Sequence, residues 1–349
     1  MTEEQMRAVV FETTGDRDVL RVGAWPRPTP GPGQALVRVL ACGVNRLDIY
    51  SRMGRTKVPL PHISGSEAAG EVVAYGPGVA LEPAPVGSRV AIAPYLFCGV
   101  CEYCRAGDET LCIRGDILGL VSQGAFAEYV VVPAASMVPL PEGVDAITAA
   151  AVGLATITAW HLLICRAKLQ AGETVLVHAA GSGVGSAAIQ IARLAGARVL
   201  ATVGSAAKVE GARRLGADEV INYGEQDFAQ EVRRLTDRRG VAVVVEHVGA
   251  ATWEKSLACL ARRGRLVTCG ATTGNEGDIN IWTLFAKELS VIGAYGGTRA
   301  DLAAVLHLVA AGRLAPVIDR VLPLTEVGEG QRLLEERAAF GKVIIDTTK

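Results

Sequence analysis

The sequence predicts an α/β protein with two domains, one rich in β-strands and one built on a doubly wound parallel sheet. The chain has 349 residues, which is more than one ordinary hydrophobic core accommodates. Its first third consists of short apolar runs separated by Pro and Gly, whereas later apolar runs alternate with helical patterns. The first pattern is typical of strands joined by turns, and the second of parallel strands covered by helices.

The first domain is predicted to span residues 1–155 and to be all-β from Met6 to about Val132. Its clearest strand candidates are ALVRVL (35–40), GEVVAYG (70–76) and SRVAIA (88–93). The apolar stretch AAAVGLATITAWHLLIC (149–165) contains a histidine and a glycine and is followed by RAKLQAGE, so we predict a buried helix there.

The second domain is predicted to span residues 156–295. Its strand candidates are TVLVHA, ARVLATV, DEVINY, VAVVVEHV, GRLVTCG and LSVIGAY, and its helix candidates are AAIQIARLAG, AAKVEGARRLG and FAQEVRRLT. Such alternation predicts a parallel sheet with helices on both faces. The final strands, VIDRVLPL and FGKVIIDT, fit the β-rich domain better, so we expect residues 296–349 to complete it.

Composition limits the class of partner. The formal net charge of −1 gives no electrostatic reason to expect a nucleic acid or an anionic membrane. The polar opening TEEQMR does not resemble a signal peptide, and no apolar run is long enough for a membrane helix. We therefore expect a cytoplasmic protein whose partner is a small molecule.

The segment HAAGSGVGSAAIQIARLAGARV (178–199) contains a glycine-rich turn between a predicted strand and a predicted helix. The helix start offers unpaired N–H groups and the positive end of a dipole, and glycines allow a pyrophosphate to approach the backbone. The turn therefore predicts dinucleotide binding. Its contacts are expected at Gly181, Ser182, Gly183, Val184 and Gly185.

The next predicted strand indicates which dinucleotide is bound. NAD-binding domains usually carry Asp or Glu at the end of this strand, but here it ends in Gly204 and Ser205, with Lys208 one turn later. Small residues and a cation favour the 2′-phosphate of NADPH, although NADH remains possible. The alternative is that Lys208 is simply a solvated helix residue.

Four of the eight cysteines fall within fifteen residues, in CGVCEYCRAGDETLC. Four thiolates can close a tetrahedron around Zn²⁺ and leave no open position for a substrate, which predicts a structural zinc. An iron–sulfur cluster or four unrelated cysteines are the alternatives. The predicted zinc ligands are Cys98, Cys101, Cys104 and Cys112.

Together, the β-rich N-terminal domain, the four-cysteine lobe, the AAGSGVG turn and the closing FGKV resemble the medium-chain dehydrogenase/reductase superfamily over essentially the whole chain. Within it, the chain is similar to bacterial zinc-containing alcohol dehydrogenases and quinone oxidoreductases. The resemblance implies a GroES-like catalytic domain carrying the structural zinc lobe, a Rossmann domain and a cleft between them.

The chain departs from the family's alcohol dehydrogenases at the catalytic zinc. In those enzymes a Cys in a CGV segment, a His in GHE and a later Cys hold the metal. The corresponding places here are expected at Cys42, Ser66 and Leu154, so one ligand of three survives. An alternative zinc site could combine Cys42 with Glu67 and His62.

VNRLDIY resembles the VNxxDxY segment of zinc-independent quinone oxidoreductases and enoyl reductases. The resemblance implies that Asn45, Asp48 and Tyr50 lie near the nicotinamide, whereas Leu47 replaces the hydroxyl residue of the zinc enzymes' proton relay. Asp48 and Tyr50 could instead be residues of a satisfied turn or core. The family pattern also implies cofactor contacts at Thr158, Tyr223, Gly270, Tyr295 and Lys342.

These observations predict an NADPH-dependent reductase that transfers hydride to a quinone or an α,β-unsaturated carbonyl. Such acceptors delocalise the developing negative charge without Zn²⁺. The alternatives are a zinc-dependent alcohol dehydrogenase with a rearranged metal site and a non-enzymatic NADPH-binding protein. ELSVIGAY (288–295) resembles the strand through which family members pair their sheets, so a homodimer or homotetramer is expected.

Overall fold

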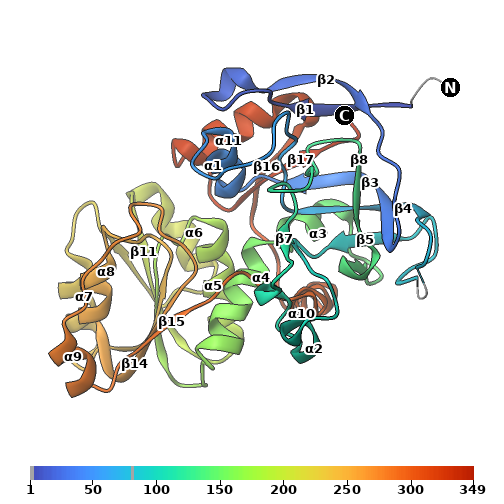
Figure 1. Ribbon diagram of the computed structural model, residues 1–349. Coiled ribbons are helices and arrows are strands. Elements are labelled where there is room, and N and C mark those ends of the chain that lie inside the picture. The colour runs from blue at the N-terminus through green and yellow to red at the C-terminus, as the bar shows by residue number, and fades with distance from the viewer. Residues whose placement is uncertain (1–3, 80–81) are drawn as a thin grey trace. The chain divides into compact units, whose positions relative to one another are not determined.

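The computed structural model describes residues 4–79 and 82–349. The chain divides into two compact units (Figure 1). The first unit is formed by Met1–Ile157 and Gly297–Lys349, and the second by Thr158–Gly296. The chain thus leaves the first unit once and returns to it, with crossings close to the predicted residues 155 and 296.

The first unit contains a seven-stranded sheet in the order β16-β17-β3-β4-β5-β9, with β8 paired to β3. Its strands are β3 (Gln34–Gly43), β4 (Ala68–Tyr75), β5 (Arg89–Ile92), β8 (Tyr129–Pro133), β9 (Met137–Pro139), β16 (Ile318–Pro323) and β17 (Lys342–Asp346). Two smaller sheets pair β1 (Gln5–Val10) with β2 (Arg21–Pro26), and β6 (Tyr95–Leu96) with β7 (Asp116–Ile117). The two C-terminal strands therefore join the N-terminal sheet, as predicted.

Short helices surround these strands. They are η1 (Arg17–Val19), α1 (Arg46–Arg52), α2 (Glu102–Ala106), η2 (Glu109–Leu111), η3 (Ala134–Ser136), α3 (Ala146–Val152), α10 (Arg299–Ala310), η6 (Leu324–Glu326) and α11 (Val327–Glu335). The core between strands and helices is largely aliphatic. It includes Val37, Val39, Val72, Ile92, Phe126, Val343 and Ile345.

The prediction of an all-β stretch from Met6 to Val132 is wrong at α2 and at α1. Helix α1 begins after Asn45, whose side chain accepts a bond from the backbone of Asp48, while Asp48 accepts one from the backbone of Asn45. This reciprocal capping satisfies two N–H groups that a helix start otherwise leaves unpaired. A local capping signal therefore overrides the strand pattern around it.

The predicted single helix over residues 149–165 is also corrected, because the segment is broken. α3 ends at Val152, α4 (Ala155–Trp160) follows, and η4 (His161–Arg166) is a π-helix. At the break, the Leu154 N–H donates to Oε1 of Glu67, a residue distant in sequence, at 2.6 Å. Among the described residues, no single helix is long and apolar enough to cross a membrane. The helices Ala146–Val152 and Ala155–Arg166 reach the necessary length and hydropathy only when they are taken together, and they are bent by 43° relative to each other.

The second unit contains a six-stranded sheet in the order β12-β11-β10-β13-β14-β15, with every neighbouring pair parallel. Its strands are β10 (Thr174–Val177), β11 (Arg198–Val203), β12 (Glu219–Asn222), β13 (Val241–Glu246), β14 (Leu260–Thr268) and β15 (Ser290–Gly293). Its other helices are α5 (Gly183–Leu194), η5 (Ala206–Lys208), α6 (Val209–Arg214), α7 (Phe228–Leu235), α8 (Trp253–Ala258) and α9 (Ile281–Ala286).

Helices cover both faces of this sheet: Figure 1 shows α5 and α6 on one side and α7 and α8 on the other. The prediction of a doubly wound sheet is confirmed. The strand order reverses between β10 and β13, which lie side by side. In such sheets, ligands bind outside the carboxyl ends of the strands at this reversal.

Candidate functional site

The glycine-rich turn lies at the carboxyl end of β10 and leads into α5. Ser182 caps the helix, with its Oγ accepting a bond from the Gly185 N–H at 2.9 Å. A Cβ atom on Gly185 would stand 2.2 Å from the carbonyl oxygen of Ala179, so only glycine fits there. The helix start is thus held close to the strand end, which is the arrangement that presents free N–H groups to a phosphate.

Most of the other predicted cofactor contacts in this unit also follow the carboxyl ends of strands. Gly204 and Ser205 follow β11, Tyr223 follows β12, Gly270 follows β14 and Tyr295 follows β15. These positions therefore share one edge of the sheet with the turn. Thr158 instead lies in α4, where it is buried.

The end of β11 carries no acidic side chain. Gly204 packs against Tyr223, because a Cβ at this glycine would be 2.6 Å from the phenol oxygen. Ser205 is exposed, and Lys208 is half-buried at the end of η5. The polar side-chain groups at this position are therefore a hydroxyl and an ammonium.

In the first unit, a buried network is centred on Glu67, which is fully buried. Its Oε1 accepts the Leu154 N–H, and its Oε2 accepts a bond from Asn45 Nδ2 at 2.9 Å. The Nζ atom of Lys342 lies 2.5 Å from the same Oε2. Lys342 also donates to Asn45 Oδ1 at 2.6 Å and to the carbonyl of Val44 at 3.2 Å.

Two predicted site residues are thereby held inside the protein. Asn45 donates to the Gly43 carbonyl at 3.2 Å as well as to Glu67, which engages both amide hydrogens. Lys342, predicted as a cofactor contact, is 5 % exposed and ion-paired with Glu67. Both side chains serve here to satisfy the buried carboxylate, and the cofactor contact of Lys342 stays a prediction.

Asp48 belongs to the same buried region. Its oxygens accept the N–H groups of Asn45 at 2.7 Å and Gly65 at 3.2 Å, and Ser66 Oγ lies 3.5 Å away. Burial raises the pKa of Asp48 to about 7, assisted by the charge of Glu67, although these hydrogen bonds and Lys342 oppose the shift. Asp48 therefore caps α1 and titrates near neutral pH.

Tyr50 differs from Asn45 and Asp48 because it is partly exposed. It lies in the middle of α1, and the guanidinium of Arg55 sits 5.7 Å from its ring centroid. Of the three residues predicted near the nicotinamide, Tyr50 is the one that is not buried.

The residues at the expected catalytic zinc positions do not fit a metal site. Cys42 is fully buried, with Sγ 3.8 Å from the Gly43 carbonyl, and burial raises the pKa of its thiol well above the ordinary value. Ser66 faces Asp48, and Leu154 offers only a backbone N–H to Glu67. A cation ligated here would compete with Lys342 for the Glu67 carboxylate.

The alternative zinc site is not assembled either. Within the described ranges, the donor atoms of Cys42, Glu67 and His62 do not gather within ligand distance of one another. The Nε2 atom of His62 lies 2.9 Å from the Gly119 carbonyl, and its ring packs edge-on against Phe11. His62 thus belongs to the core around the β1 segment.

The four predicted zinc-ligand cysteines do come together. Their sulfur atoms all lie within 4.8 Å of one another, with Cys101 to Cys104 at 3.4 Å and Cys101 to Cys112 at 3.9 Å. Tetrahedral Zn–S bonds of about 2.3 Å give sulfur–sulfur edges of about 3.8 Å. Backbone N–H groups of Val100 and Cys101 lower the pKa of Cys98 to about 5, which favours the thiolate that a metal needs.

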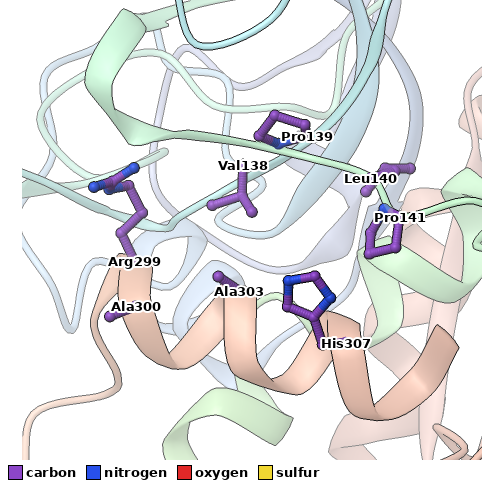
Figure 2. A pocket seen from close by; sticks show the side chains of 8 residues that line it. All are labelled: Val138, Pro139, Leu140, Pro141, Arg299, Ala300, Ala303 and His307. Atoms are coloured by element: carbon purple, nitrogen blue, oxygen red, sulfur yellow. The ribbon is translucent and has the colours of Figure 1, made fainter. Parts of the chain in front are cut away.

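A groove of about 460 Å³ lies elsewhere in the first unit, between the end of β9 and α10 (Figure 2). Arg299, Ala303 and His307 project into it from one face of α10. The opposite wall is formed by Val138, Pro139, Leu140 and Pro141. None of the predicted catalytic, cofactor or zinc residues lines this groove.

Comparison with known proteins agrees with this geometry. Residues 31–142 match the alcohol dehydrogenase GroES-like domain, and residues 183–311 match the zinc-binding dehydrogenase domain. A quinone oxidoreductase of Pseudomonas aeruginosa is 34% identical, over 97% of this chain and 99% of that protein. The chain belongs to the medium-chain dehydrogenase/reductase superfamily.

Other members of this superfamily are also similar. An NAD-dependent alcohol dehydrogenase of Saccharolobus solfataricus is 33% identical, over 97% of this chain and 99% of that one. The crystal structure of an NAD-dependent alcohol dehydrogenase shares 44% identity and a TM-score of 0.93, covering 98% of this chain and 100% of that one. This medium-chain dehydrogenase/reductase is an oxidoreductase that uses a nicotinamide cofactor and zinc.

The central role of Glu67 was not predicted, beyond its place in an alternative metal site. Its signal is the acid in GSE, flanked by small residues and far in sequence from its partner Lys342. Pairing with Lys342 depends on the return of the C-terminal strand, which no local pattern around Glu67 reveals.

The raised pKa of Asp48 predicts a pH-dependent contribution to stability. Between about pH 4 and 7 the unfolded chain releases a proton that folded Asp48 retains, so stability from this group falls as pH rises, by roughly 1–4 kcal/mol in total. Asp48→Asn removes the titrating group. As the pH rises from about 4 to 7, the unfolding free energy of the wild type should therefore fall relative to that of the variant. Urea unfolding at each pH measures this difference, with Asp145→Asn, an exposed helix-capping aspartate, as control. A difference that is constant with pH would contradict the assignment.

Proposed function

We propose that this oxidoreductase is an NADPH-dependent reductase that transfers hydride to a quinone or an α,β-unsaturated carbonyl without a catalytic zinc. The observation that carries the proposal is the Glu67 network. Both oxygens of this carboxylate are used by Lys342, Asn45 and the Leu154 N–H, in the region where the superfamily's zinc alcohol dehydrogenases hold their metal. The name of the Pseudomonas relative supports the same class of acceptor.

The chemistry follows from the missing Lewis acid. Hydride addition places negative charge on the acceptor, and a simple ketone needs a metal or a strong donor to stabilise that charge. A quinone or an enone spreads the charge over its own conjugated system. An enzyme without a metal at this position is therefore suited to acceptors that are already activated.

Each unit supplies different groups to this reaction. Bound NADPH supplies the hydride. The Gly181–Gly185 turn binds the pyrophosphate through N–H groups at the start of α5, and Ser205 and Lys208 receive the 2′-phosphate. Tyr50 hydrogen-bonds the acceptor carbonyl and returns a proton, because both amide hydrogens of Asn45 are engaged within the protein.

The zinc is assigned to the four-cysteine lobe and to a structural role. Four thiolates fill a tetrahedral zinc and leave no open position for substrate. The cysteines lie in the irregular segment around α2 and η2, which has few buried residues of its own. A metal crosslink is what such a segment needs to hold a fixed shape.

We expect the purified, dialysed protein to contain about one zinc ion per chain, as a single closed site requires. Cys112→Ser should lose the metal, whereas Cys259→Ser, which changes a lone buried cysteine of the second unit, should keep it. Elemental analysis measures both. About two zinc ions, with alcohol oxidation that chelators abolish, would instead support the zinc-dependent alcohol dehydrogenase.

Tyr50→Phe should lower kcat/KM for quinones and enones by ~10- to 100-fold, the usual effect of removing one donor or acid from a transition state. The dissociation constant of NADPH should stay unchanged, because the cofactor turn lies in the other unit. Steady-state kinetics and fluorescence titration measure the two effects. Tyr103→Phe in the cysteine lobe is the matched control, and an unchanged rate in Tyr50→Phe would remove this residue from the scheme.

We further propose that the protein forms a homodimer, or a dimer of dimers, through β15. This strand ends the six-stranded sheet and is bonded to β14 alone among the described strands. Such an edge offers a row of unpaired N–H and C=O groups to a second copy. Just before this strand in the chain, α9 exposes Ile281, Trp282 and Phe285 at 72%, 70% and 58%.

Val291→Lys should convert the assembly to a monomer, because a lysine on the pairing strand places charge within an apolar interface. Val321→Lys is the matched control, since both valines are 36% exposed and lie on edge strands, but of different sheets. Light scattering coupled to gel filtration gives the mass. A Val291→Lys protein that remains dimeric would show that the copies pair elsewhere.

A further inference from the structure

A chain of buried polar groups lies beneath the phosphate-binding turn of the second unit. It runs from the N–H of Ala179 through Thr202, His178 and Ser256 to the carboxylate of Glu246. The four links are Ala179 N to Thr202 Oγ1 at 3.1 Å, Thr202 Oγ1 to His178 Nδ1 at 3.1 Å, His178 Nε2 to Ser256 Oγ at 2.9 Å, and Ser256 Oγ to Glu246 Oε2 at 2.6 Å. We call these five groups the Glu246 chain; its four side chains are at most 1 % exposed.

The two ends of the Glu246 chain fix the direction of every hydrogen bond in it. The Ala179 N–H can only donate, so Thr202 accepts from it; the Thr202 hydroxyl proton goes to His178 Nδ1 because the other end of the chain leaves that nitrogen without a proton. At the other end an ionised Glu246 can only accept, so Ser256 gives it its proton and accepts from His178 Nε2–H. With the proton on Nδ1 instead, two lone pairs would face each other between His178 and Ser256.

The charge states agree with this assignment. Burial lowers the pKa of His178 to about 4, so its ring is neutral at physiological pH. Burial opposes ionisation of Glu246, but hydrogen bonds from Ser256 and from backbone N–H groups hold its pKa below the ordinary value. A neutral ring with one donor and one acceptor is what a one-way chain requires.

At its donor end, the chain reaches the residue that opens the glycine-rich turn. Ala179 has a φ angle of +49°, in the left-handed region that a non-glycine residue adopts only when its surroundings hold it there. Its carbonyl accepts the Ser182 N–H at 2.8 Å and stands against Gly185. The orientation of Ala179 therefore sets where Ser182 caps α5.

At its acceptor end, the chain reaches a second loop at the same edge of the sheet. Glu246 Oε1 accepts the N–H groups of Val248 at 2.7 Å and Gly249 at 3.1 Å, just after β13. Thr252 Oγ1 lies 2.9 Å from Glu246 Oε2. A single carboxylate thus joins the loops that follow β10 and β13, the two strands between which the sheet order reverses.

We propose that Glu246 is a positioning residue for the dinucleotide, acting through the tautomer of His178 and the backbone of Ala179. It touches neither cofactor nor substrate; it holds the N–H groups of the turn in the orientation that receives the pyrophosphate. The proposal rests on the dinucleotide-binding function proposed above and extends it to residues outside the glycine motif.

The test combines a spectroscopic readout with a binding readout. In wild-type protein labelled with ¹⁵N at its five histidines, His178 should show a protonated Nε2 and an unprotonated Nδ1. Glu246→Gln places an amide donor against Ser256, so the Ser256 proton turns toward His178 and the ring proton moves to Nδ1. The dissociation constants of NADPH and NADH should both rise by about tenfold, the effect of one lost buried hydrogen-bond link.

Glu173→Gln is the matched control, because Glu173 is also an ion-paired acid of this unit, bonded to Arg265 at 2.6 Å at the start of β10. It should alter neither the His178 tautomer nor cofactor affinity. If Glu246→Gln does not fold, Thr202→Val tests the same link with an isosteric change. It leaves the carboxylate in place, and it should also raise both dissociation constants.

The outcomes separate this proposal from the function on which it rests. An Nδ1-protonated His178 in wild type overturns the chain, whatever the protein binds. Unchanged affinity for both cofactors in Glu246→Gln, or in Thr202→Val where the first variant does not fold, overturns the positioning role alone. Failure of the wild-type protein to bind either cofactor overturns both proposals.

Discussion

The first unit depends on one buried charge, the carboxylate of Glu67. An ionised group without water costs several kcal/mol unless a counter-charge and hydrogen bonds replace its hydration. Its three donors come from distant parts of the chain: Asn45 before α1, Leu154 at the break after α3, and Lys342 on the last strand. Satisfying Glu67 therefore requires that the C-terminal strand return to the N-terminal sheet.

The same requirement bears on the chemistry of this region. A carboxylate that already accepts an ammonium, an amide and a backbone N–H has little left to offer a metal ion. Asn45 completes the arrangement, because it bridges Glu67 and Lys342 with one amide and so keeps acid and base at fixed positions. A lysine in place of a divalent cation supplies the positive charge that the packing of this region requires.

Much of the fold could be predicted from the sequence because it depends on local periodicity. Short apolar runs predict the six parallel strands, the helices between them and the return of FGKVIIDT to the first domain. The cysteine lobe was equally accessible, since its four ligands lie within fifteen residues. The helix α1 was missed because Asn45 was interpreted as a functional residue and Asp48 as either a functional residue or part of a turn or core, whereas their i, i+3 spacing is also a capping box.

The long-range networks could not be predicted, for a different reason. Glu67 and Lys342 are separated by 275 positions in the sequence, and no local pattern around either residue predicts that they pair. The sequence HAAGSG likewise does not predict the left-handed conformation of Ala179, because its glycines suggest a turn that depends only on glycine flexibility. The strain at a non-glycine residue is sustained by Thr202, a residue of the neighbouring strand.

The two units solve the problem of a buried carboxylate in different ways, and the difference follows from what each carboxylate has to do. Glu67 holds three segments in place, so an ammonium is an adequate partner, since it offers several donors and no acceptor. Glu246 is surrounded by hydroxyl and backbone donors, with Ser256 and Thr252 against one oxygen. A lysine at that position would displace the Ser256 proton and leave the His178 tautomer unspecified. Neutral donors keep the carboxylate as the single terminal acceptor, and this gives the hydrogen bonds beneath the phosphate-binding turn one direction.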